Sequence, residues 1–227
     1  MGVPKRIALY GGTFDPVHVG HLAVARSLLD LFALDRVLFI PAHRAPHKQG
    51  RSTTAGLHRY AMLALATQGE GRFLVSTVEL DAPERPYTVE TLSRMREEFG
   101  SSARLFFVMG ADSWSEITTW LDWERVLTLT DQIVMARPGY DLDAGHVTQD
   151  VRERIVDLRG QGAGAVASQV GNGGGPKIFV TDAVVMDVSA TAVRNAVNRE
   201  SDNDWRSLVP PPVADYIEKY GLYRDQA

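Results

Sequence analysis

Two histidines three residues apart, His18 and His21, are the side chains of this sequence best suited to chemistry. They follow Gly11-Gly12-Thr13 at the predicted start of a helix, so both rings should project to one side. Glycines let a ligand approach the backbone closely, and the first turn of a helix has N–H groups without an intrahelical partner. Backbone donors, the helix dipole and two imidazoles therefore predict a triphosphate site, in which the imidazoles donate hydrogen bonds to an oxyanion at phosphorus.

A metal site is the alternative for this pair, because histidines at this spacing can chelate an ion. However, no carboxylate stands at matching helical spacing, and Asp15 precedes the predicted helix. We therefore favour phosphate binding and expect no metal ligands among these residues.

A second set of polar side chains, Ser189, Thr191 and Arg194, lies near the other end of the chain. The hydroxyls stand at a predicted helix start, and the arginine follows about one turn later. Taken alone, this pattern is typical of an ordinary N-cap with a solvated arginine. Together with the glycine turn it predicts a second phosphate clamp, since a guanidinium can hold two phosphate oxygens at once.

Five further residues are candidates for substrate contacts. His47 and Lys48 lie in a polar loop. Their side chains could bind phosphate or could simply be solvated charges. Asp112 follows a predicted strand and could accept bonds from ribose hydroxyls, cap the next helix, or do both. Thr88 begins a predicted helix whose N–H groups suit a carboxylate, and Trp120 offers a stacking face for a flat ring, although core packing is the commoner fate of a tryptophan.

Strands alternate with helices along the chain, which predicts a doubly wound parallel α/β sheet with helices on both faces. Apolar runs predict strands at 7–10, 36–40, 73–80, 105–109, 133–136, 177–180 and 184–188. Helical spacing predicts helices at 22–32, 57–67, from 88 to 99, at 151–158, after 189 and near the C-terminus. Each candidate motif then falls at the carboxyl end of a strand, where such sheets bind ligands.

The segment 160–175 holds seven of the twenty glycines. Its first part, residues 160–165, has the spacing of a dinucleotide fingerprint, with Asp182 about twenty residues on. A helical pattern precedes it and no amphipathic helix is evident after it, so we interpret the segment as a flexible surface loop. The expected organisation is one domain, 1–227. It comprises a core at 1–188 with a flexible insertion near 141–176, and a small C-terminal helical part at 189–227 that supplies the clamp helix and a cap.

Composition narrows the classes of function. The 227 residues carry a formal charge of −4, which argues against bulk binding of nucleic acid or a membrane surface. The absence of cysteine excludes disulfides, thiolate zinc sites and cysteine nucleophiles. With no signal-peptide pattern and no apolar run of spanning length, we expect a cytoplasmic protein.

The stretch 11–21, Gly-Gly-Thr-Phe-Asp-Pro-Val-His-Val-Gly-His, resembles the nucleotidyltransferase superfamily with the signature His-x-Gly-His. Further motifs make the chain similar to the bacterial nicotinate-nucleotide adenylyltransferase family. They are Pro46-His47-Lys48, residues 87–92, Gly110-Ala111-Asp112-Ser113, Trp120, Arg137-Pro138-Gly139-Tyr140, residues 189–194 and the C-terminal stretch 208–223.

This resemblance implies a Rossmann-like core and attack of nicotinate mononucleotide on the α-phosphorus of ATP, giving deamido-NAD and pyrophosphate, with Mg²⁺ carried on the phosphates. It implies that His18 and His21 stabilise the transition state. The same resemblance implies that Thr88 and Trp120 bind the mononucleotide. It implies that ATP is bound by Gly12, Thr13, Phe14, Lys48, Asp112, Ser189, Thr191 and Arg194. The implied partners are these two substrates, without nucleic acid or membrane, and a homo-oligomer is compatible with the pattern.

Two rival functions stay open at this point. Another adenylyl- or cytidylyltransferase of the superfamily, such as phosphopantetheine adenylyltransferase, would share the first motif, but would not be expected to show the motifs at 87–92 and 110–113. A nucleotide-binding regulator without turnover would bind ATP and release no pyrophosphate.

Overall fold

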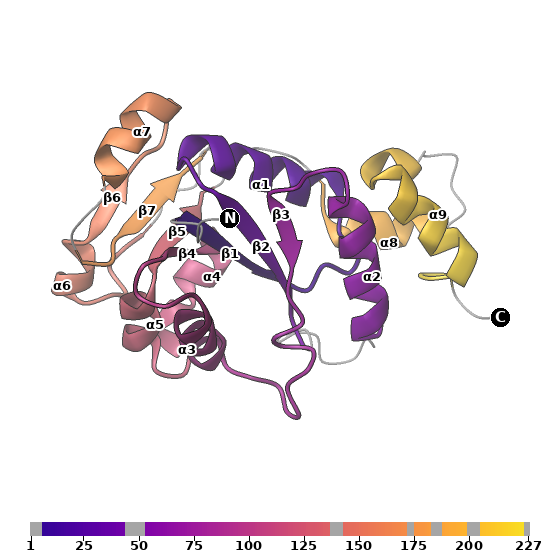
Figure 1. Cartoon of the computed structure of the whole chain (residues 1–227), viewed down its shortest axis with the longest axis horizontal. Coiled ribbons are helices and arrows are strands. Elements are labelled where there is room, and N and C mark those ends of the chain that lie inside the picture. Colours follow the sequence, from indigo (N-terminus) through magenta and orange to yellow (C-terminus); the bar gives the residue numbers. More distant parts are fainter. Residues whose placement is uncertain are drawn as a thin grey trace.

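Seven parallel strands form one sheet in the computed structural model, which describes residues 6–43, 53–136, 143–171, 175–182, 188–198 and 205–224. The strand order is β3-β2-β1-β4-β5-β7-β6 (Figure 1). The strands are β1 (Arg6–Gly12), β2 (Arg36–Pro41), β3 (Phe73–Val75), β4 (Arg104–Gly110), β5 (Asp131–Met135), β6 (Ile155–Asp157) and β7 (Ile178–Thr181). This is the predicted doubly wound, Rossmann-like arrangement.

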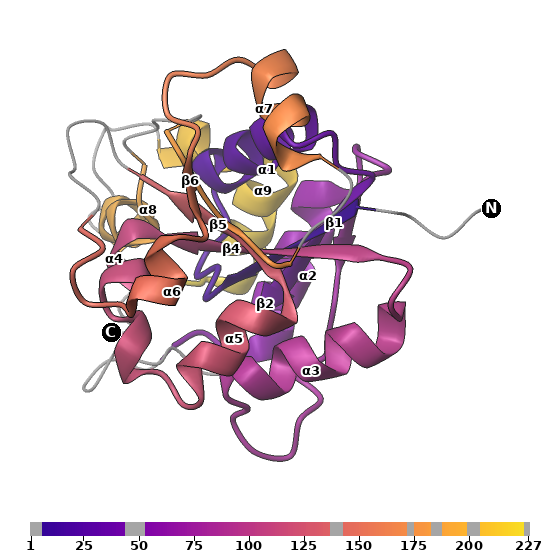
Figure 2. The ribbon, with the colours of Figure 1, turned by 90° about the vertical axis from the view of Figure 1, so that its left-hand side faces the viewer.

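Helices cover both faces of the sheet, which explains why its central strands are apolar on both sides. In Figures 1 and 2, α1 and α7 lie on one face, and α3 and α5 on the other. The first core is shared by α1 (Val19–Leu31), α2 (Gly56–Thr67), α7 (Ala163–Val170), α8 (Ala190–Asn198) and α9 (Pro211–Tyr220). The second is shared by α3 (Thr88–Phe99), α4 (Ala111–Ser115), α5 (Trp123–Leu129) and α6 (Gln149–Arg152). The short helices η1 (Ile117–Thr119) and η2 (Trp205–Leu208) complete the described elements. No described helix is long and apolar enough to span a membrane.

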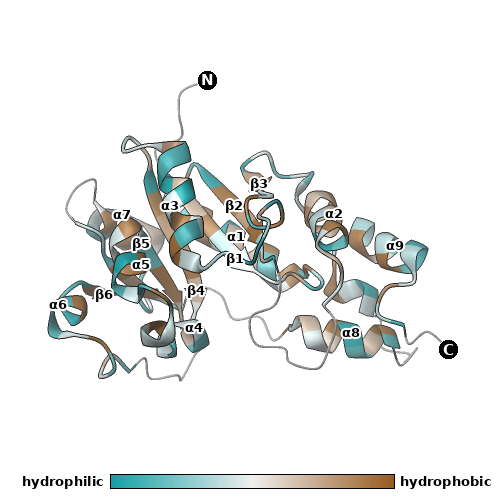
Figure 3. Cartoon of the chain, turned by 90° about the horizontal axis from the view of Figure 1, so that it is seen from below, coloured by the Kyte–Doolittle hydropathy of each residue, from teal (hydrophilic) through white to brown (hydrophobic). Residues whose placement is uncertain are grey.

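Amphipathic helices and apolar strands account for this layering. Leu92 and Met95 of α3 are buried against the sheet, while Glu97 and Glu98 on the same helix are exposed. Figure 3 shows this contrast between hydrophilic helix surface and hydrophobic strands. Helix α3 ends at Gly100, whose φ of 67° belongs to the left-handed region that glycine adopts most easily.

The sheet changes winding direction between β1 and β4, its two central strands. Leu9 of β1 pairs with Leu38 of β2 on one side and with Phe107 of β4 on the other. The chain continues from β1 into α1 on one face, and from β4 into α4 on the other. A crevice at the carboxyl ends of two such strands is where this class of sheet binds ligands.

Two of the elements expected from the sequence differ in the structure. The strand predicted at 73–80 ends at Val75, and the chain then runs irregularly to α3. The helix predicted at 151–158 is instead the short α6 followed by strand β6, in which Ile155 pairs with Ile178 of β7. Apolar residues at this spacing fit either structure, and pairing at the sheet edge decides between them.

The glycine-rich segment is not a uniform loop, because it contains α7. Gly160 and Gly171 take positive φ values of 70° and 54° at the two ends, while Ala163, Ala165 and Ala167 between them favour a helix. Helix α7 packs against α1 (Figure 2). Residues 184–187 of the strand predicted at 184–188 lie outside the described residues, and Val188 is not in a strand.

Candidate functional site

The two histidines stack on one another at the first turn of α1. Their ring centroids are 3.7 Å apart and the planes differ by 30°. His18 is the N-cap of the helix, and its backbone N–H donates to Nδ1 of His21 at 3.2 Å. Since Nδ1 of His21 accepts this bond, the proton of the neutral ring is on Nε2. The predicted convergence of the two rings is confirmed.

Aromatic side chains surround the ring of His21 and remove water from it. Phe14 lies edge-on at 5.0 Å and Tyr10 at 6.2 Å between ring centroids. This burial lowers the pKa of His21 well below its usual range, and the neighbouring His18 lowers it further. Burial also lowers the pKa of His18, to about 4. Both rings are therefore neutral hydrogen-bonding groups near pH 7.

The glycine turn is shaped by Phe14, whose backbone has a positive φ of 49°. Phe14 is 2% exposed, and its ring lies so close to Gly12 that a Cβ there would meet it at 2.9 Å. Glycine at position 12 therefore lets the ring fold under the turn. The Phe14 side chain therefore packs beneath the turn, and the contact with ATP that the resemblance implies for this residue stays a prediction.

Arg194 of α8 reaches the glycine turn from the other end of the sequence. Its Nη1 donates to the backbone carbonyl of Asp15 at 2.5 Å, and its Nη2 donates to Oγ1 of Thr191 at 3.0 Å. Oγ of Ser189 accepts from the backbone N–H of Ala192 at 3.1 Å, so the serine caps the helix as predicted. Exposed hydroxyls at Ser189 and Thr191 thus stand at a helix start beside a guanidinium that touches the turn.

Asp15 and Tyr223 form a contact that sequence reasoning missed. The Tyr223 hydroxyl donates to Oδ1 of Asp15 at 2.7 Å, and the backbone N–H of Thr54 donates to Oδ2 at 3.3 Å. Burial and the Asp15 carboxylate raise the pKa of the Tyr223 phenol. The end of the chain is thereby joined to the loop that carries the histidines, and no local pattern indicated this pairing.

Arg59 was also missed, although it is 1% exposed in α2. It donates to carbonyl oxygens of three segments: Nε to Thr54 at 2.9 Å, Nη1 to Thr13 at 2.8 Å, and Nη2 to Ala42 at 2.7 Å. An arginine in register with the apolar positions Met62 and Leu63 was the available signal, because buried arginine needs several acceptors.

Thr88 and Trp120, which the resemblance assigns to the mononucleotide acceptor, lie on the face of the sheet opposite to α1. Thr88 is the first residue of α3, where backbone N–H groups have no intrahelical partner. Trp120 is half-buried and meets Phe107 of β4 edge-on at 6.4 Å between centroids. Phe107 also lies 3.5 Å from a Cβ built on Gly11, so the Phe107 ring borders the glycine turn. Asp112 is exposed in the first turn of α4, after Gly110 as N-cap.

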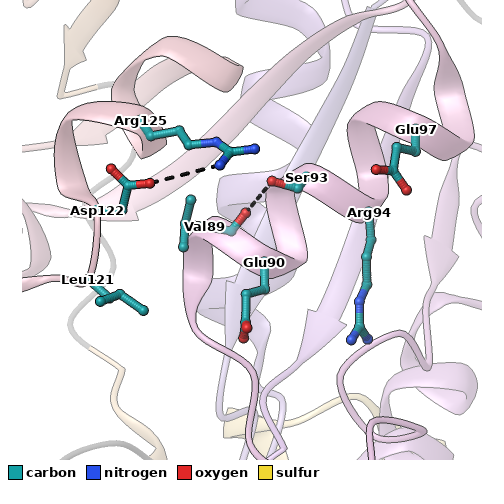
Figure 4. Close-up of a pocket in the computed structure, with 8 residues that line it drawn as sticks. All are labelled: Val89, Glu90, Ser93, Arg94, Glu97, Leu121, Asp122 and Arg125. Carbon is teal, nitrogen blue, oxygen red and sulfur yellow. Dashed lines mark hydrogen bonds and ion pairs between the residues drawn. The ribbon is translucent and has the colours of Figure 1, made fainter.

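An open groove of about 510 Å³ adjoins this region between α3 and the start of α5 (Figure 4). It begins next to Thr88 and Trp120 and is lined by Val89, Glu90, Ser93, Arg94, Glu97, Leu121, Asp122 and Arg125. Its charges have both signs, and Arg125 pairs with Asp122 at 4.0 Å. None of the predicted site residues lines this groove.

His47 and Lys48 lie outside the described residues, as does the stretch 137–140. Within the part of the chain that the structure describes, no three His, Asp or Glu side chains gather in a way that could hold a metal ion. The described donors are imidazoles, hydroxyls, a guanidinium and helix N–H groups. They suit an anionic ligand rather than a cation.

Comparison with known proteins agrees with this chemistry. The family model for cytidylyltransferase-like proteins matches residues 9–196. A probable nicotinate-nucleotide adenylyltransferase of Desulfatibacillum aliphaticivorans is 34% identical, covering 96% of this chain and 99% of its own. One of Thermomicrobium roseum is 36% identical, covering 97% and 92%.

A solved structure has the same fold. It is the Plasmodium falciparum nicotinic acid mononucleotide adenylyltransferase complexed with NaAD, with a TM-score of 0.70, 20% identity, and coverage of 96% of this chain and 97% of the other. With full-length relatives above 30% identity and a family model over most of its length, the chain belongs to the nicotinate-nucleotide adenylyltransferase family of cytidylyltransferase-like nucleotidyltransferases.

Proposed function

We propose that this protein transfers the adenylyl group of ATP to nicotinate mononucleotide, giving deamido-NAD and pyrophosphate in NAD biosynthesis. The observation that carries the proposal is the meeting of two helix starts at one glycine turn. His18 and His21 lie at the start of α1, and Arg194 of α8 bonds to Asp15 in the same turn. The names of the full-length relatives support the identity of the two substrates.

The chemistry required is modest, because the attacking phosphate is already anionic at neutral pH. No strong base is needed, and catalysis reduces to holding two polyanions in line while charge moves onto pyrophosphate. Orientation of bound reactants can supply up to about 7–11 kcal/mol of the barrier. A single aimed donor can supply roughly 3–4 kcal/mol.

His21 is suited to the donor role. The hydrogen bond at Nδ1 fixes the ring and leaves Nε2 with its proton. Because the rings are neutral, the fixed Nε2–H group of His21 would donate a hydrogen bond to an α-phosphate oxygen. It would not bring a full positive charge. Ser189, Thr191 and Arg194, with help from Lys48, would hold the outer phosphates. Gly12 and Thr13 would hold the nucleotide close to the turn, and Asp112 would contact the ribose.

The acceptor pocket is assigned to Thr88 and Trp120. The start of α3 offers backbone N–H groups and a helix dipole, which favour a carboxylate over a neutral amide. Trp120 would stack on the pyridine ring. We further propose that Mg²⁺ enters with the ATP phosphates. A cytosolic location, independence from nucleic acid and a homo-oligomeric state also remain predictions.

The decisive experiment is pyrophosphate release from ATP and Mg²⁺ with nicotinate mononucleotide and nicotinamide mononucleotide side by side. We expect clear turnover with the acid and lower kcat/KM with the amide. Equal efficiency would refute the proposed pocket but not the reaction. Turnover only with phosphopantetheine or glycerol phosphate would assign another member of the superfamily. ATP binding by calorimetry without pyrophosphate release would indicate a regulator.

A further inference from the structure

We propose that Glu79 is a positioning residue that fixes α3, and with it the acceptor pocket, relative to the glycine turn that holds ATP. The inference rests on the proposed function, because it assigns the two ends of this linkage to the two substrates. Glu79 lies in the irregular connection that runs from β3, at the edge of the sheet, to α3 (Figure 1).

Each carboxylate oxygen of Glu79 accepts a hydrogen bond from a different element. Oε1 accepts from the hydroxyl of Thr91 in α3 at 2.9 Å, and Oε2 accepts from the backbone N–H of His43 at 3.3 Å. His43 is in the loop that follows β2. One side chain therefore bridges the acceptor helix and the loop beside the glycine turn.

The linkage continues from His43 to the glycine turn. Arg59 donates Nη2 to the carbonyl oxygens of Ala42 and His43, at 2.7 and 3.3 Å, and Nη1 to that of Thr13 at 2.8 Å. The backbone N–H of Ala42 also donates to the carbonyl of Gly12 at 2.9 Å. The loop after β2 is thus fixed to the turn by both its backbone and a buried guanidinium.

At its other end the linkage reaches the acceptor pocket. Thr91 is buried and stands three residues after Thr88, on the first turn of α3. A bond at Thr91 therefore sets where the first N–H groups of this helix lie. The connection itself is held in place, because Leu80 packs so closely on Gly56 that a Cβ there would meet it at 2.8 Å.

A carboxylate is a costly choice for a merely structural role at this place. Burial raises the pKa of Glu79, so the surroundings disfavour its charged form. An apolar side chain would fill such space at lower cost, whereas a carboxylate with two donors fixes direction and distance. In a reaction between two bound substrates, a displacement of about 1 Å can lower the rate roughly a hundredfold.

The test compares T91V with T91S, because valine removes the donor and serine restores it. Two-substrate kinetics of pyrophosphate release are measured for each variant with ATP and nicotinate mononucleotide. We expect T91V to lower kcat/KM for the mononucleotide about tenfold or more, with KM for ATP within about twofold of the unmodified protein. T91S should recover most of the loss. S93A is the matched control, because Ser93 donates its hydroxyl to the carbonyl of Val89 in the same helix, and its kinetics should not change.

A fall in melting temperature for T91V with unchanged kcat/KM would overturn the proposal and leave the linkage structural. A rise in KM for ATP as large as that for the mononucleotide would overturn it too, since it indicates general distortion. E79A, measured alone and combined with T91V, adds a check: the loss in kcat/KM of the double variant should be less than the product of the two single losses, because each change removes the bond between residues 79 and 91. If the unmodified protein released no pyrophosphate with either mononucleotide, the proposed function would fail, and the inference with it.

Discussion

The guanidinium of Arg194 donates a hydrogen bond to the backbone carbonyl of Asp15, a residue 179 positions earlier in the chain. Asp15 lies three residues before His18, so this bond brings the start of α8 to the start of α1. Both helices belong to the same face of the sheet. The two phosphate-binding elements expected from opposite ends of the sequence therefore form one site.

Arg194 should be required for ATP binding and not for folding of the sheet. We expect R194K to raise KM for ATP about tenfold, because an ammonium keeps the charge but cannot reach both Asp15 and a phosphate with a planar fork. R206A is the control, since Arg206 pairs with Asp215 and Glu218 on the C-terminal helical part. Steady-state kinetics check this, and an unchanged KM for ATP in R194K would remove Arg194 from the clamp.

Tyr223 should stabilise the histidine loop through Asp15. In Y223F the buried Oδ1 of Asp15 loses its donor, which costs about 1–3 kcal/mol of unfolding free energy. Y220F is a suitable control, because Tyr220 is half exposed at the end of α9. Urea unfolding of the two variants measures the difference. Equal stabilities would mean that the contact with Asp15 contributes nothing.

The histidine pair should make stability fall in mild acid. The pKa of His18 is lowered to about 4 in the folded protein from an ordinary value of 6.5, and that of His21 is lowered in the same direction. Above pH 6.5 both states are neutral. As the pH decreases from 6.5 toward 4 the unfolded chain takes up protons first, so the free energy of unfolding decreases.

Denaturant unfolding across this pH range measures the effect. H18Q should flatten part of the profile, because glutamine keeps a polar side chain at the N-cap and has no proton to gain. A profile of H18Q parallel to that of the unmodified protein would contradict the assignment. Since both rings are neutral at pH 7, the rate should depend little on their titration between pH 7 and 8.

Much of the fold and site follows from local sequence. The strands β1 and β4, the helix starts at Val19 and Ala190, and the capping by Ser189 depend on residues close in the chain, so apolar runs and turn chemistry reveal them. The prediction failed where contacts between segments distant in sequence determine the secondary structure. Strand β6 exists because Ile155 pairs with β7, and α7 packs on α1 between two glycines with positive φ.

The unpredicted parts of the site have the same origin. Arg59 and Tyr223 act through carbonyl and carboxylate groups far from them in sequence. Their partners can be identified only after the sheet brings the loops together. The packing of the Phe14 ring against Gly12 likewise follows from the backbone of the turn, which local sequence patterns do not give.

The most direct test of the account is pyrophosphate release by H21N with saturating ATP and nicotinate mononucleotide. Asparagine retains an acceptor near Nδ1 for the backbone N–H of His18, but it lacks the donor at Nε2. We predict a loss of about two to three orders of magnitude in kcat with a nearly unchanged melting temperature. A rate near that of the unmodified protein would contradict the claim that the imidazole stabilises the transition state.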